Sequence, residues 1–132
     1  MLVMSSMYLP PRSHEGQLLR VAAAYNAGWG LAAIVAPNRL ARVLGFEGSG
    51  DGMGWRAAGV MVLAYAPAYL WAADHPREGR PLLATAVLGK AIGAVGWIAG
   101  LVLGVFRPRT LLLPLMNDLI WLPGLLRGLR DP

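Results

Sequence analysis

Long apolar segments alternate with short polar connections along this chain. Four segments are long enough to cross a membrane as helices, at residues 18–36, 55–73, 81–106 and 110–126. About 20 apolar residues span a bilayer core as a helix, and proline, glycine or charged residues bound each segment. The pattern therefore predicts an all-α fold, an integral membrane four-helix bundle.

The connection after the first segment has a helical pattern of its own. In residues 38–45 (NRLARVLG), Arg39 and Arg42 can lie at headgroup level while Leu40 dips inward, and Gly45 is a natural helix stop. We therefore expect a short interfacial helix between the first and second spans.

The chain divides into a tail and one domain. Residues 1–17 predict a loose N-terminal tail, because serine and proline pairs interrupt its apolar residues and no cleavage signal is recognisable. Residues 18–132 predict a four-span transmembrane domain. Pro67, Pro114 and Pro123 lie inside predicted spans and are expected to bend them.

Composition supports the membrane class. Hydrophobic residues make up 56% of the 132 residues and charged residues 14%, far below the roughly 25% charged content of soluble domains. The net charge of +5 comes from scattered arginines, which suit anionic lipid headgroups, and no basic run suggests a nucleic-acid partner. Arginines are slightly more numerous on the side of the termini, so we expect a bacterial inner-membrane protein with cytoplasmic termini.

Two opposite charges interrupt the apolar spans. With a rise of about 1.5 Å per residue, Lys90 lies roughly 13 Å below one membrane face and Asp118 roughly 12 Å below the other. Charges at this depth cost at least about 2.5 kcal/mol, so they usually face a partner or a cavity. Arg56 is the rival partner for Asp118. The polar-core or ligand candidates at this depth are Asn26, Arg56, Tyr65, Lys90, Asn117 and Asp118, accompanied by Tyr25 and Tyr69.

This polar layer has two readings. It can lock the register of the bundle, or it can line a small cavity that holds a hydrophobic small molecule, a lipid, an ion or a proton. An enzyme would use Asp118 with Lys90 or a tyrosine as acid and base, but no catalytic residue or cofactor is indicated. Cysteine is absent, and His14 and His75 have no neighbouring ligands, so no metal site is predicted.

Glycines mark one face of the third span. Their spacing of three and four residues aligns them on a helix, where small residues let another helix approach closely, either within the monomer or in a homodimer. They are Gly89, Gly93, Gly96, Gly100 and Gly104.

Tryptophans fall into two groups. Trp55 and Trp71 bracket the second span as interface anchors, whereas Trp29, Trp97 and Trp121 lie deeper and are expected to pack against other helices. An aromatic ligand cage is the alternative.

Several of these residues together resemble a known family. The chain is similar to a family of small, uncharacterised bacterial four-helix membrane proteins that are DoxX-like in size and layout, and the resemblance implies the architecture but no activity. It rests on Asn117-Asp118-Leu119-Ile120-Trp121 (NDLIW), Tyr25-Asn26, Pro37, Leu44-Gly45, Arg56, Gly59, the stretch from Asp74 to Pro76, Leu88-Gly89-Lys90 and Gly93.

The sequence thus favours a small membrane protein that acts as a binding or accessory subunit, alone, as a homodimer or in a larger membrane complex. A small dimeric proton- or ion-coupled transporter is the alternative. An enzyme acting on a membrane-dissolved substrate is the third reading.

Overall fold

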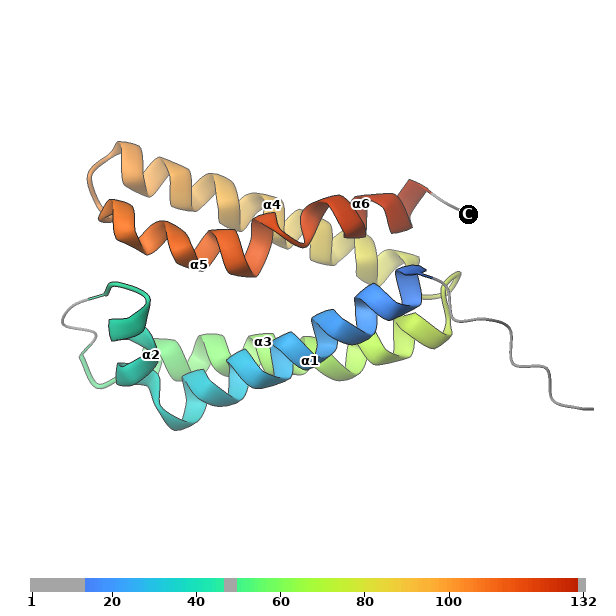
Figure 1. Ribbon diagram of the computed structural model, residues 1–132, viewed down its shortest axis with the longest axis horizontal. Coiled ribbons are helices and arrows are strands. Elements are labelled where there is room, and N and C mark those ends of the chain that lie inside the picture. Colours follow the sequence, from blue (N-terminus) through green and yellow to red (C-terminus); the bar gives the residue numbers. More distant parts are fainter. Residues whose placement is uncertain (1–13, 47–49, 131–132) are drawn as a thin grey trace, which may run out of the picture.

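In a computed structural model of the protein, which describes residues 14–46 and 50–130, every regular element is helical (Figure 1). The all-α prediction is therefore confirmed for this part of the chain. The elements are α1 (His14–Val35), α2 (Pro37–Val43), α3 (Met53–Asp74), α4 (Arg80–Val102), η1 (Pro108–Leu111), α5 (Leu112–Pro114), η2 (Leu115–Leu119) and α6 (Leu122–Arg130).

The helices form two antiparallel hairpins. In the first, α1 runs beside α3 with the short α2 at the turn; in the second, α4 runs beside the broken segment from η1 to α6 (Figure 1). The hairpins contact each other through α1 with α6 and through α3 with α4. Their ribbons diverge toward the end that carries α2 (Figure 1).

The first hairpin contains the closest approach between helices. A Cβ added to Gly30 would lie 2.7 Å from the carbonyl oxygen of Gly59, and a Cβ added to Gly59 would lie 2.7 Å from that of Gly30. Ala33 packs beside them and is fully buried. Small residues therefore bring the α1 and α3 backbones together.

The glycines of α4 do not serve this purpose, so the predicted close packing within the monomer is wrong at Gly89 and Gly96. The alternative, a homodimer contact along that face, stays a prediction. Space around Gly89 and Gly96 is open, Gly93 faces the carboxylate of Asp118, and Gly100 lies under the ring of Phe106. Helical spacing identifies residues that share a face, but it does not reveal whether another backbone covers that face.

A core of alanine and larger apolar side chains joins the hairpins. Tyr69 on α3 is 2% exposed, and α1, α4 and α6 contribute further buried residues. The cluster comprises Leu19, Ala22, Ala23, Ala66, Tyr69, Ala72, Leu83, Ala86, Trp121 and Leu125. An ion pair also joins Arg20 of α1 to Asp74, the last residue of α3.

Some boundaries differ from those predicted. Helix α1 begins at His14 rather than at residue 18, while residues 1–13 of the predicted tail lie outside the described part of the chain. The short helix after α1 is confirmed as α2, and Gly45 follows it with φ +85°. Helix α4 ends at Val102, and Gly104 with φ +73° reverses the chain. The predicted fourth span, in which Pro114 and Pro123 are expected to cause bends, is not one regular helix, because residues 108–130 contain several short helical pieces.

Two of the described helices, α1 and α4, are long and apolar enough to cross a membrane by length and composition alone. Helix α3 has 22 residues and continues through Pro67.

Replacing Gly59 by alanine tests the close contact in the first hairpin. The added methyl group would collide with the backbone of α1, so we expect a loss of about 1 to 3 kcal/mol in unfolding free energy. The measurement is thermal unfolding of the purified protein in mild detergent. Gly96→Ala is the matched control, since its Cβ enters open space; equal melting of both variants would contradict the assignment.

Candidate functional site

The site is built on an interruption of the last helical segment. Residue 114 is proline, which has no N–H to offer the carbonyl four residues earlier, that of Thr110. The indole Nε1–H of Trp97, on the facing helix α4, donates to this carbonyl oxygen at 3.1 Å. A side chain thus supplies the hydrogen bond that the backbone cannot make.

The next turn widens into a π-helix, η2. The backbone N–H of Ile120 donates to the Leu115 carbonyl at 3.2 Å, and the backbone N–H of Trp121 donates to the backbone carbonyl of Asp118 at 3.2 Å. In a regular α-helix those donors would bond to Met116 and Asn117 instead. The wide turn therefore leaves the Met116 and Asn117 carbonyls available to other donors.

Side-chain donors form hydrogen bonds with both of these carbonyls. Trp121 Nε1 donates to Met116 at 2.9 Å, and Lys90 Nζ donates to the backbone oxygen of Asn117. An unpaired carbonyl in apolar surroundings costs about 1 to 3 kcal/mol. Indole and ammonium donors therefore stabilise the irregular turn, and π-turns of this kind frequently occur at functional sites.

Lys90 also forms an ion pair with Asp118. Its Nζ lies 3.8 Å from Oδ1, and the two side chains are 15% and 21% exposed respectively. Helices α4 and η2 thus bring together the two charges singled out in the sequence. Arg56 is exposed on α3 and is not in this pair.

The other polar candidates lie in different places. The hydroxyl of Tyr25 on α1 donates to Asn117 Oδ1 at 2.7 Å and so ties the first hairpin to η2. Asn26 is 7% exposed and shares the buried face of α1 with Gly30. Tyr65 lines a small pocket of about 120 Å³ together with Tyr69, Ala86, Gly89, Lys90 and Asp118.

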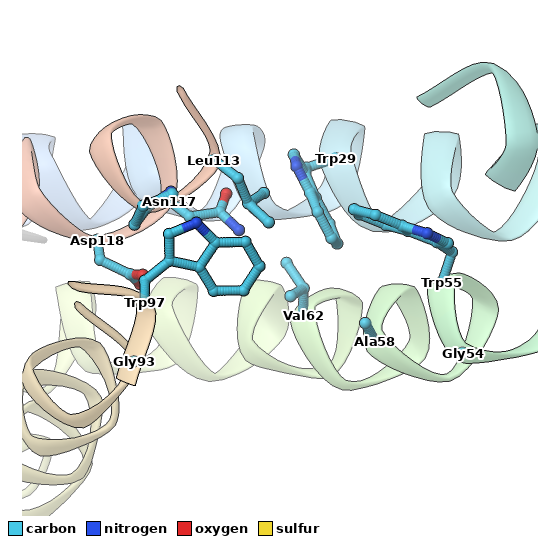
Figure 2. A pocket seen from close by; sticks show the side chains of 11 residues that line it. Trp29, Gly54, Trp55, Ala58, Val62, Gly93, Trp97, Leu113, Asn117 and Asp118 are labelled. Atoms are coloured by element: carbon cyan, nitrogen blue, oxygen red, sulfur yellow. The ribbon is translucent and has the colours of Figure 1, made fainter. Parts of the chain in front are cut away.

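A larger pocket of about 490 Å³ lies between the hairpins. Figure 2 shows Asn117 and Asp118 at one end and Trp55 at the other, with the rings of Trp29 and Trp97 between them. Apolar groups cover most of its wall. Its lining residues are Trp29, Gly54, Trp55, Ala58, Val62, Gly93, Trp97, Leu113, Pro114, Asn117 and Asp118.

An aromatic cluster joins the hairpins beside this pocket. Phe46, after α2, has its ring centroid 5.1 Å from that of Trp55 and 5.8 Å from that of Trp97. Trp97 stacks on Phe106 at 4.3 Å, and Trp29 lies 6.3 Å from Trp55. These contacts hold three of the pocket's aromatic walls in position.

Asp118 lines both pockets, whereas Lys90 lines only the smaller one. Among the lining residues that lie in the described part of the chain, the carboxylate of Asp118 is therefore the one ionisable group of the larger pocket. Within residues 14–46 and 50–130, no group of histidine, aspartate and glutamate side chains is arranged to hold a metal ion.

Sequence reasoning assigned too small a role to the tryptophans. The sequence predicts interface anchoring for Trp55 and helix packing for Trp29 and Trp97, with an aromatic ligand cage as the alternative. In the structure all three line the larger pocket. The available signal was their location in three separate spans, but only the tertiary arrangement brings them to one cavity. Pro114, which the sequence predicts to bend its helix, also forms part of the pocket wall.

The ion pair can be tested by a double-mutant cycle. Asp118→Leu leaves Lys90 without a counter-charge and should lower the unfolding free energy by about 2 kcal/mol, because partial exposure softens the cost of a broken buried pair. Lys90→Met with Asp118→Leu should cost less than the sum of the single changes. Thermal unfolding measures all three variants. Additive losses would show that the two groups do not interact, and Arg56→Gln serves as a control expected to have no effect.

Trp97→Phe tests the indole hydrogen bond. The ring remains aromatic but Thr110 loses its donor, so we expect a loss of about 1 kcal/mol in unfolding free energy. Trp71→Phe is the control, since Trp71 is 47% exposed. If both substitutions change the melting temperature equally, the hydrogen bond has no special role.

Comparison of the chain with protein-family models, with curated proteins and with solved structures gives no match. The resemblance to the four-helix membrane family stays a prediction.

Proposed function

We propose that this protein is a four-span integral protein of the bacterial inner membrane that binds a hydrophobic small molecule in the pocket between its hairpins. The pocket carries the proposal. Ligand sites typically enclose about 300 to 1,000 Å³, are mostly apolar and have a few polar groups that fix orientation. The pocket of about 490 Å³, with tryptophan walls and the polar pair Asn117 and Asp118 at one end, fits this description.

The surface of the helices supports the membrane assignment. Large apolar side chains are exposed on both hairpins, and apolar surface this extensive is typical of contact with lipid or a partner. Examples are Val21, Leu31 and Val35 on α1, Val60, Met61 and Leu70 on α3, Leu88, Ile92, Val95, Ile98 and Val102 on α4, and Leu112, Leu115, Met116, Leu119, Ile120 and Leu126 in the last segment.

Helix lengths and the last segment agree with four spans. Helices α1, α3 and α4 have 22, 22 and 23 residues, and about 20 residues cross a bilayer core. The broken segment after α4 runs back along it (Figure 1). Irregular backbone is tolerated at membrane depth where protein groups satisfy it, and Trp97, Trp121 and Lys90 supply such groups here.

A proton- or ion-coupled transporter is the second candidate. One observation favours it: Asp118 lines the larger pocket and also the smaller pocket beside Tyr65 and Tyr69. A carboxylate reached from two cavities can exchange a ligand or proton between them when its partner moves. Flux measured in liposomes would distinguish transport from simple binding.

Filling the pocket provides the test of binding. Protein extracted into lipid nanodiscs would be analysed by native mass spectrometry for retained small molecules. Ala58→Trp places an indole in the pocket and should abolish retention, whereas Ala64→Trp, at an exposed position on the same helix, should leave it intact. A bound species that survives Ala58→Trp would exclude this pocket as its site.

A further inference from the structure

We infer that the ligand is a neutral aromatic amphiphile whose hydroxyl group sits between Asn117 and Asp118. This inference rests on the proposed binding function and specifies the chemistry of the ligand. It follows from the donors, acceptors and charges that face the larger pocket.

Asn117 offers a donor to the pocket. Its Oδ1 already accepts the Tyr25 hydroxyl at 2.7 Å, and its backbone oxygen accepts Lys90. The remaining polar group of the side chain is the Nδ2 amide, which carries two N–H donors. Because Asn117 lines the pocket, the amide is the group available to an acceptor atom on a ligand.

Asp118 offers an acceptor beside it. Oδ1 lies 3.8 Å from Lys90 Nζ. Oδ2 is the oxygen nearer to Gly93, at 3.4 Å from the position that a Cβ would take there, and Gly93 is part of the pocket wall. Oδ1 is therefore the oxygen paired with the lysine, and Oδ2 lies on the Gly93 side of the carboxylate. Since Asp118 also lines the larger pocket, we assign Oδ2 as the acceptor for a ligand donor.

The charges of Lys90 and Asp118 favour a ligand whose polar group is neutral. Lys90 already compensates the carboxylate, so a cationic ligand would bring a second positive charge near the lysine without a counter-ion of its own. An anionic ligand would meet the carboxylate, the one ionisable group among the described residues that line this pocket. Unpaired charge in an apolar environment is strongly unfavourable. A hydroxyl group can donate to Asp118 and accept from Asn117 while remaining neutral.

The part of the pocket away from Asn117 and Asp118 favours an aromatic ring in the apolar portion of the ligand. The rings of Trp29, Trp55 and Trp97 face the cavity, and Val62 and Leu113 complete its apolar wall (Figure 2). Aromatic pairs prefer offset or edge-to-face contacts that contribute beyond area burial. A flat ring fits between these indoles, with its hydroxyl toward Asn117.

The test uses four probes that share a bromonaphthalene body and carry a hydroxymethyl, methyl, aminomethyl or carboxylate group. Bromine quenches nearby tryptophan fluorescence, so quenching of the full-length protein in nanodiscs reports binding beside Trp29, Trp55 and Trp97. We expect the hydroxymethyl probe to bind at least about ten-fold more tightly than the methyl probe, as a hydrogen bond to a charged acceptor implies. The aminomethyl and carboxylate probes should bind more weakly than the hydroxymethyl probe.

A double variant locates the preference. In Lys90→Met with Asp118→Leu, both charges are removed together, and the ratio of the hydroxymethyl to the methyl affinity, measured on the same variant, should fall to about one. If this variant does not fold, the order of the four probes on the unmodified protein decides alone. Ala58→Trp, with Ala64→Trp as its control, shows whether quenching comes from the pocket.

The outcomes separate the inference from the proposed function. Pocket-dependent binding with equal affinity for all probes, or with the aminomethyl or carboxylate probe tightest, overturns the hydroxyl assignment but leaves the binding function standing. Hydroxyl preference that persists in the double variant also overturns the assignment to Asp118. Quenching by none of the probes, or quenching unaffected by Ala58→Trp, overturns both.

Discussion

Backbone hydrogen bonding in the last helical segment is the constraint on which the rest of the structure depends. Pro114 cannot donate to Thr110, and the π-turn from Leu115 to Leu119 releases the carbonyls of Met116 and Asn117. In apolar surroundings each released carbonyl requires a donor. Trp97 and Lys90 on α4 provide two of these donors, and Trp121 in the same segment provides the third, so side chains stabilise the break.

The same donors shape the pocket. The hydrogen bond to Thr110 fixes the indole of Trp97, whose ring then forms a pocket wall. Lys90, held on the Asn117 carbonyl, sets the charge beside Asp118 and leaves one carboxylate oxygen directed toward Gly93. The same side chains therefore satisfy the broken helical segment and position the groups of the pocket, so a substitution of one of them affects both.

Sequence reasoning predicted the helical class, the short helix after α1 and a possible pairing of Lys90 with Asp118, because apolar run length and isolated charges are local signals. It did not predict the π-turn, which depends on donors from Lys90 on α4 and from Trp121 in the same segment. It placed the close helix contact on the α4 glycines rather than at Gly30 and Gly59, since spacing alone does not identify the opposing backbone. The pocket depends on tryptophans from three elements that are distant in sequence.

Side-chain size explains why the pocket lies at one end of the molecule. The core that joins the hairpins contains many alanines, such as Ala66 and Ala86, which allow the helices to approach. Toward α2 the facing side chains are Trp29, Trp55 and Trp97, which are too bulky to permit the same separation. The hairpins are therefore close together where the small residues lie and farther apart where the indoles lie. The ring of Phe46 contacts Trp55 of the first hairpin and Trp97 of the second, and these contacts help to hold the hairpins at this separation.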